Sequence, residues 1–157
     1  MKKIIILLSV ILAVMIIFPA GLVICISQND FYNTVDHIKF KNILDEPKGD
    51  HLYYFYEKKT EYCDDLEPEM EEFVHRLDST DKIDIKFIDM RKKANEDGWE
   101  EDLDKVYEVE KTKTLDDFKV VGVPAMLHVK DGVAVEYKEN LYNVEEMMDE
   151  IEAEYDI

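Results

Sequence analysis

Thr60 and Cys63 have the spacing of a site for thiol chemistry. Two residues separate them, and they stand between the apolar run Leu52 to Tyr56 and a stretch with a helical pattern. A thiolate at the start of a helix can attack a disulfide, and a second thiol can then break the mixed disulfide that results. This chain has one thiol where that reaction needs two, because a hydroxyl occupies the earlier position.

Little nucleophilic reactivity is expected of either side chain. The Thr60 hydroxyl cannot exchange with a disulfide unaided, and His51, His75 and His128 show no catalytic or metal-ligand spacing. Cys63 lies one turn further in, where it would be more buried, and acids occupy the next two positions. Burial and negative charge oppose the thiolate, while the helix dipole favours it. Cys63 is therefore either a small core residue, as free cysteines usually are, or a weak nucleophile.

Cys25, the other cysteine of the chain, lies in an apolar N-terminal segment far from Cys63. A disulfide needs Cα atoms within about 7 Å of each other. We therefore expect no internal disulfide, and we also expect no metal site and no cofactor.

The elements around the two residues can be read from hydrophobic periodicity. Leu52 to Tyr56 is short and rich in aromatic residues, which predicts a buried strand. After Cys63, apolar residues recur every three or four positions, which predicts an amphipathic helix; they are Leu66, Met70, Phe73, Val74 and Leu77. Pro68 falls inside this helix and should kink it.

The second half of the chain continues the alternation of strands and helices. Ile83 to Ile88 predicts a strand, and the charged stretch 91–114 predicts a surface helix. Val120 to Val129 predicts a strand interrupted by Pro124, and Lys130-Asp131-Gly132 predicts a hairpin turn into a strand at 133–137. A closing amphipathic helix has Asn143 as its expected N-cap.

Two landmarks resemble the thioredoxin family. That family has Cys-x-x-Cys at a helix start with a proline five residues after the second cysteine, which is the separation of Cys63 and Pro68. Gly122-Val123-Pro124, followed by the hairpin turn, resembles its cis-proline loop. The resemblance covers about residues 38 to 155, with an insertion around 91–114 like those of membrane-tethered Gram-positive relatives, including bacteriocin-transport accessory proteins. It implies a thioredoxin fold, an α/β fold with a mixed central sheet and helices on both faces.

The resemblance also implies roles for particular residues. Thr60 would occupy the place of the first cysteine, and Cys63, preceded by Tyr62, the place of the second. The loop at Val123 and Pro124 would offer backbone hydrogen bonds to an extended peptide, with Tyr62 as a further contact. Tyr54 would replace a buried acid that the family's enzymes use in proton transfer.

Two other assignments of the motif remain open. Cys63 could be the first cysteine and Leu66 the replaced second one, although Pro68 would then come too early. Thr-x-x-Cys also resembles peroxiredoxins, but these carry a proline four residues before the threonine, where this chain has Tyr56. The aromatic run from Tyr53 to Tyr56 could line a peptide groove, but core packing is the commoner role of such a run.

The first 27 residues predict a membrane anchor. Lys2 and Lys3 precede an uncharged apolar stretch from Ile4 to Ile26, which at about 1.5 Å per residue can cross a hydrocarbon layer of ~30 Å. The positive-inside tendency then places the following domain outside the cytoplasm. A cleaved signal peptide and a lipoprotein signal ending at Cys25 are the alternatives.

Charge limits the classes of partner. The chain has 19 basic and 37 acidic residues, and the segment after residue 26 alone carries a net charge of −20. Nucleic-acid binding depends on Lys and Arg, so a nucleic-acid partner is excluded. Basic or neutral peptides are the partners that such a surface favours.

These observations predict three regions: an anchor at 1–27, a juxtamembrane segment with a first strand and helix at 28–50, and a thioredoxin-like domain at 51–157. We expect a single-pass cell-membrane protein whose domain is extracytoplasmic, lacks dithiol exchange, and binds peptide or protein partners in export or envelope assembly. A monothiol oxidoreductase or isomerase that uses Cys63 is the alternative.

Overall fold

The computed structural model describes residues 30–45, 48–80, 82–100 and 118–157. The chain divides into two compact units, residues 1–34 and Val35–Ile157. In the first unit, the described residues form the short 3-10 helix η1 (Phe31–Asn33), whose N-cap Asp30 accepts a hydrogen bond from the Tyr32 amide. The predicted anchor lies outside the described residues. No helix in the described part of the chain has the length and apolar character needed to span a bilayer.

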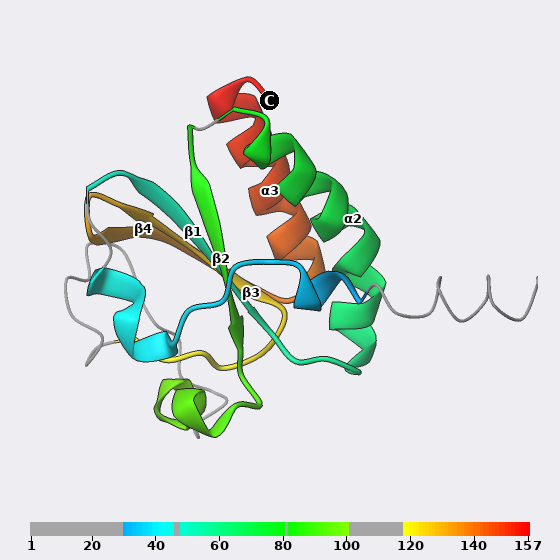
Figure 1. Cartoon of the computed structure of the whole chain (residues 1–157), viewed down its shortest axis with the longest axis vertical. Coiled ribbons are helices and arrows are strands. Elements are labelled where there is room, and N and C mark those ends of the chain that lie inside the picture. Colours follow the sequence, from blue (N-terminus) through cyan, green and yellow to red (C-terminus); the bar gives the residue numbers. More distant parts are fainter. Residues whose placement is uncertain (1–29, 46–47, 81, 101–117) are drawn as a thin grey trace, which may run out of the picture. The chain divides into compact units, whose positions relative to one another are not determined.

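A mixed four-stranded sheet forms the centre of the second unit (Figure 1). Its strands are β1 (Asp50–Tyr56), β2 (Asp84–Asp89), β3 (Ala125–Lys130) and β4 (Val133–Glu139), in the order β2-β1-β3-β4. β1 is parallel to β2 and antiparallel to β3, and β3 is antiparallel to β4. An isolated bridge at His37 adds to the outer edge of β2.

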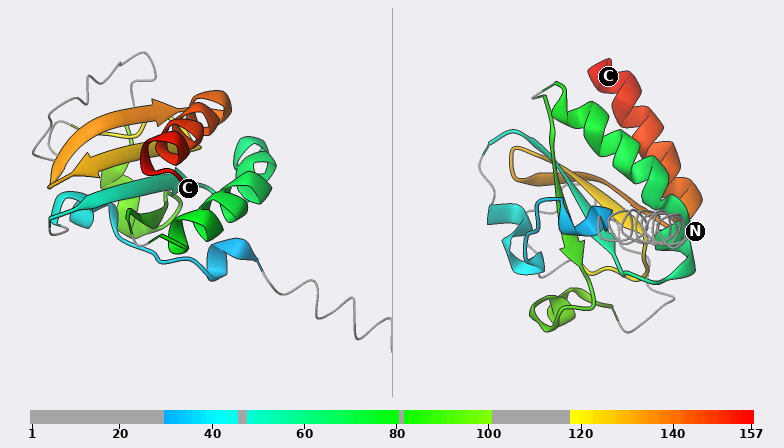
Figure 2. Two further views of the ribbon diagram at one scale, coloured as in Figure 1. Left: turned by 90° about the horizontal axis from the view of Figure 1, so that it is seen from above. Right: turned by 45° about the vertical axis from the view of Figure 1, so that its right-hand side comes forward.

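The helices α2 (Glu61–Asp78) and α3 (Leu141–Tyr155) lie side by side on one face of the sheet (Figures 1 and 2). The buried residues of α2 repeat at three- and four-residue intervals, as predicted; they are Cys63, Leu66, Met70, Phe73 and Leu77. An ion pair between Arg76 and Glu152 links the two helices. Burial of one apolar stripe against the sheet is what stabilises such helices in a protein.

Two 3-10 helices, η2 (Phe40–Asp45) and η3 (Lys93–Gly98), belong to the opposite side of the sheet. Phe40 and Ile43 pack there with Tyr53 and Phe55 of β1 in one apolar cluster. Because β1 is covered on both faces, Leu52 to Tyr56 are all fully buried, which explains why this strand is a continuous apolar run rather than an alternating one.

Several predicted features are confirmed. The β3–β4 hairpin turns at Asp131 and Gly132, which both have positive φ, 51° and 75°; glycine adopts this backbone without a steric cost. α2 runs through Pro68 as one helix, and the kink expected there stays a prediction. Pro68 and Asp64, whose carbonyl would have bonded the missing amide, are both exposed, so water can satisfy that carbonyl.

Two predicted features are wrong. α3 starts earlier than expected: its N-cap is Asn140, whose side chain accepts from the Asn143 amide at 3.2 Å. Asn143 instead donates its side-chain amide to the Glu139 carbonyl. In the charged stretch, residues 93–98 form a 3-10 helix in place of the expected surface helix. Trp99 is not helical either, because it forms an isolated β-bridge with Val120, a distant residue of the chain. Residues 101–117 of the expected surface helix lie outside the described residues.

Candidate functional site

The loop between β1 and α2 closes on itself through its own polar groups. The Thr60 hydroxyl donates to the Glu57 carbonyl at 2.9 Å, and the Lys59 amide donates to Asp64 Oδ1 at 3.1 Å. Lys59 has φ 68°, which allows the chain to reverse before the helix. Thr60 is the N-cap residue of α2, but its side chain makes no capping hydrogen bond. The hydroxyl thus braces the loop and does not cap the helix.

Arg91 ties this loop to the end of β2. Its Nη1 donates to the Lys58 carbonyl at 2.8 Å, and its Nε lies 3.5 Å from Asp89 Oδ1. Asp89 is itself buried at the strand end. The loop is therefore held from both sides, by its own hydrogen bonds and by a charged side chain that sequence reasoning did not single out.

Cys63 lies in the first turn of α2 and is fully buried. Burial raises the pKa of its thiol, and this outweighs the hydrogen-bonding contacts with the Thr60 hydroxyl, the Glu57 backbone and the Tyr54 hydroxyl, which lower it. The Thr60 hydroxyl already donates its single proton to the Glu57 carbonyl. It must rotate away from that carbonyl before it can donate to a Cys63 thiolate. At neutral pH the sulfur is therefore a buried, protonated thiol.

The aromatic side chains of β1 belong to the core. Tyr53 to Tyr56 are all fully buried, which excludes them from the lining of an exposed groove. Tyr54 and Tyr56 stack with ring centroids 6.1 Å apart. The Tyr56 hydroxyl lies 2.8 Å from Nε2 of His37, a residue that no local pattern connects with this strand. Exposed aromatic area is found instead at Tyr62 and Tyr142, whose exposed fractions are 59% and 77%.

The segment Val121 to Pro124, called here the docking loop, leads into β3 through a cis peptide bond between Val123 and Pro124. The Val121 amide donates to Glu139 Oε1 at 3.2 Å, and the Pro124 carbonyl accepts from the Asn140 amide at 3.0 Å. Between these two points, no described residue hydrogen-bonds with the backbone of Val123. A Cβ atom placed on Gly122 would meet nothing within 4 Å. The middle of the loop can thus offer a donor and an acceptor to another chain.

The sheet register brings the two sequence landmarks to the same end of the sheet. Phe55 pairs with Ala125, so the loop that leaves β1 and the docking loop that enters β3 lie at the same end of these strands. The N-termini of α2 and α3 are at this end too (Figure 1). Thr60, Tyr62 and Cys63 therefore share one end of the domain with Val123 and Pro124.

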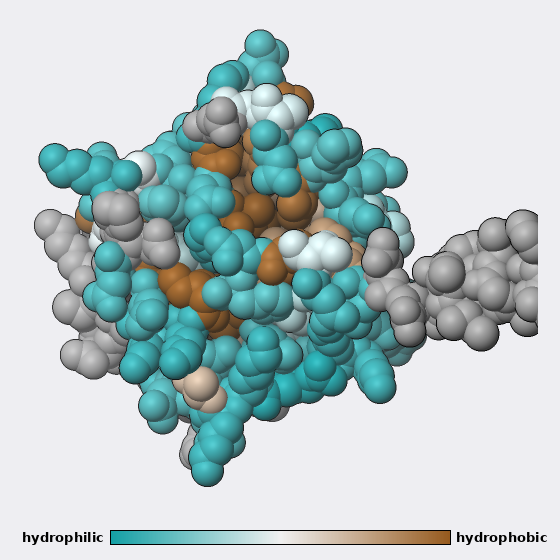
Figure 3. All heavy atoms as spheres, viewed as in Figure 1, coloured by the Kyte–Doolittle hydropathy of each residue, from teal (hydrophilic) through white to brown (hydrophobic). Residues whose placement is uncertain are grey.

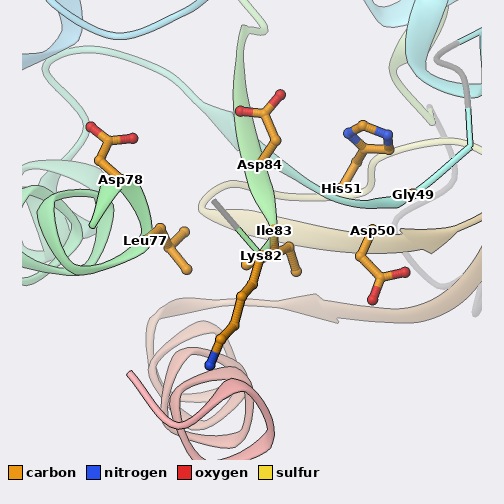
Figure 4. A pocket seen from close by; sticks show the side chains of 8 residues that line it. All are labelled: Gly49, Asp50, His51, Leu77, Asp78, Lys82, Ile83 and Asp84. Atoms are coloured by element: carbon orange, nitrogen blue, oxygen red, sulfur yellow. The ribbon is translucent and has the colours of Figure 1, made fainter. Parts of the chain in front are cut away.

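A cavity of about 420 Å³ lies at the other end of the sheet (Figure 4). Asp50 and His51 from β1, Asp84 from β2 and Lys82 are among its lining residues. Three of the charged lining residues have partners: Asp50 accepts from the Tyr155 hydroxyl, Asp84 pairs with Lys86 at 2.8 Å, and Lys82 donates to the Tyr155 carbonyl. Within the described ranges, no group of three or more His, Cys, Asp or Glu residues could hold a metal ion.

Comparison with known proteins gives the fold. No protein-family model and no curated protein matches this sequence. Among solved structures, oxidised mitochondrial thioredoxin 3 of Saccharomyces cerevisiae is similar at 12% identity and a TM-score of 0.51, over 76% of this chain and 97% of that one. Thioredoxin f2 of Chlamydomonas reinhardtii is similar at 9% identity and a TM-score of 0.53, over 76% and 95%. The chain has a thioredoxin-like fold, as predicted.

Proposed function

We propose that this chain is a membrane-tethered, extracytoplasmic protein that uses a thioredoxin fold to bind extended peptide segments and does not carry out dithiol exchange. The observation that carries the proposal is the state of Cys63. Its thiol is fully buried, its pKa is raised by burial, and a threonine stands where a second thiol would be needed. Neither the attacking step nor the resolving step of dithiol exchange then has a reactive group.

The docking loop supports the binding half of the proposal. Val123 lies between the two anchored ends of the loop, and its N–H and C=O have no partner in the described part of the chain. A peptide can pair with these groups as an added strand, a mode in which backbone hydrogen bonds supply affinity. Such binding needs no thiol, so it survives the loss of the first cysteine.

The surface charge supports a basic or neutral partner. Hydrophilic side chains cover most of the face seen in Figure 3, and acids outnumber bases by 37 to 19 over the chain. Complementary charge speeds association and disfavours wrong partners more than it adds affinity. With the proposed tether, we extend the proposal to a role as an accessory in export or envelope assembly.

The tether itself is tested by extraction of membranes with alkaline carbonate. The full chain is expected to stay with the lipid pellet, because the apolar segment 4–26 is long enough to span a bilayer. A variant that lacks residues 1–27 is the matched control and is expected in the supernatant. Recovery of the full chain in the supernatant contradicts the proposed anchor.

The state of Cys63 is tested by its rate of reaction with iodoacetamide at pH 7.5. A Cys25→Ser background leaves one thiol to label. We expect alkylation in the native protein to be at least about tenfold slower than in guanidinium-unfolded protein, because the sulfur must first be exposed by local opening. In the same assay, Tyr62→Cys with Cys63→Ser moves the thiol to an exposed neighbouring position and should label close to the unfolded rate.

A monothiol oxidoreductase is the second candidate, and one observation favours it. The Thr60 hydroxyl, the Glu57 backbone and the Tyr54 hydroxyl all make contacts with the sulfur that lower its pKa. In that reaction the Cys63 thiolate would form a mixed disulfide with one substrate sulfur and release the other as a thiolate. A low-molecular-weight thiol would then free Cys63. Rapid native alkylation, with insulin reduction that is lost in Cys63→Ser, would establish this function in place of the binding role.

A further inference from the structure

Glu139, the last residue of β4, contacts the docking loop directly. Its Oε1 accepts the Val121 amide at 3.2 Å and also accepts the Tyr137 hydroxyl. Its backbone is fixed as well, because Glu139 pairs with Ala125 across the sheet and its carbonyl accepts from Asn143 Nδ2 at 3.0 Å. A carboxylate held at both its backbone and its side chain is a rigid acceptor.

The residue after Glu139 holds the other end of the same loop. Asn140 donates its amide to the Pro124 carbonyl at 3.0 Å. Two consecutive residues thus anchor the first and last residues of a four-residue loop, while Gly122 faces open space. A loop that is already ordered loses less conformational freedom when a peptide binds, so anchoring it increases affinity.

The contacts of the Glu139 carboxylate are suited to holding the docking loop in one position. Tyr137 packs edge-on against Phe118, with ring centroids 5.0 Å apart. Burial raises the pKa of the Tyr137 phenol most, and the hydrogen bond to Glu139 raises it further. The hydroxyl therefore remains a donor over the physiological pH range. Hydrogen bonds to an ionised acceptor are about twice as strong as neutral ones. The carboxylate therefore has a fixed donor on one side and the docking loop on the other.

We propose that Glu139 is a positioning residue for peptide binding: its carboxylate holds Val121 so that Gly122 and Val123 present their backbone to an extended partner. This inference rests on the proposed function. It makes the carboxylate, which lies outside both sequence landmarks, a determinant of peptide affinity.

Three variants of the full chain, in detergent, test the role. Glu139→Ala removes the acceptor, Glu139→Gln keeps an oxygen that can accept from Val121, and Glu136→Ala removes an acid of the same strand that pairs with Lys138 at 3.4 Å. Amide hydrogen exchange reports the order of residues 118–125. The binding probe is reduced and carbamidomethylated lysozyme, a permanently unfolded basic polypeptide, with affinity measured by fluorescence anisotropy.

We expect Glu139→Ala to speed exchange in the docking loop and to weaken probe binding about tenfold, the equivalent of about 1.4 kcal/mol. Glu139→Gln should recover the affinity to within about threefold, and Glu136→Ala should change neither readout. Unchanged exchange in Glu139→Ala overturns the inference. Faster exchange with unchanged affinity also overturns it, while peptide binding itself stands. Absence of probe binding by the wild-type chain contradicts the proposed function, and the role of Glu139 in peptide affinity falls with it.

Discussion

Thr60→Cys will form a disulfide with Cys63, and the variant will reduce insulin faster than the parent chain does. The two positions are already in contact, because the Thr60 hydroxyl makes a hydrogen-bonding contact with the Cys63 sulfur. Residues three apart at the start of a helix have Cβ atoms about 5–6 Å apart, and a disulfide needs only a small adjustment from there. The new thiol would stand at the helix N-cap, where the dipole lowers a thiol pKa, and Cys63 would resolve the mixed disulfide.

The measurement combines mass spectrometry with an insulin-reduction assay, again in the Cys25→Ser background. After treatment with glutathione disulfide, the Thr60→Cys protein should lose about 2 Da and all free thiol, and its turnover should rise at least about tenfold over the parent. Thr60→Ser is the control, and it should leave Cys63 reduced. A Thr60→Cys protein that stays reduced would point to the other register, which Leu66→Cys then tests.

Gly98→Ala is expected to destabilise the domain by about 1–3 kcal/mol, the usual range for overpacking. The added Cβ would lie 2.6 Å from Cγ and Cδ2 of the Phe40 ring. That ring cannot move aside freely, because it stacks on Phe118 with centroids 5.8 Å apart and packs against Phe55. The Gly98 carbonyl also accepts the Val120 amide at 2.8 Å, so a shift here reaches the segment that leads into the docking loop.

Urea unfolding followed by circular dichroism measures this effect. Gly122→Ala is a matched control, because the same added methyl meets nothing within 4 Å and should change the free energy of unfolding by less than about 0.5 kcal/mol. Equal midpoints for the two variants would mean that the Phe40 contact is not tight, and that η2 and η3 are loosely packed.

Local pattern was enough for most of the secondary structure. The repeat of buried residues in α2, the aromatic run of β1 and the Asp131-Gly132 turn each depend on neighbours within a few residues, so their periodicity is visible in one chain. The residues at which helices begin and end were harder to predict. The N-cap of α3 is Asn140 rather than Asn143, and both residues have side chains that favour capping, so residue type alone did not separate them. Trp99 follows a helical pattern but pairs with Val120, which lies 21 positions away.

The polar contacts of the site could not be read in this way. His37 lies 19 residues from Tyr56, Arg91 lies 33 from Lys58, and Glu139 lies 18 from Val121. No spacing rule relates such residues, because their side chains meet only after the sheet has formed. Figure 1 shows that the ends of several elements lie together at one end of the domain. Motifs that are separate in the sequence form one candidate site for this reason.

Patterns along the chain predict the thioredoxin-like fold, and Thr60 with Cys63 leaves one thiol where dithiol exchange needs two, whatever the packing. What that thiol can do depends on contacts that form only in the folded domain. The pKa of Cys63 depends on the burial of the inward-facing side of α2, and the shape of the docking loop depends on Glu139 and Asn140. The two kinds of feature differ in range, because helix and strand patterns repeat over a few residues, whereas solvent exclusion and side-chain hydrogen bonds come from segments that only folding brings together.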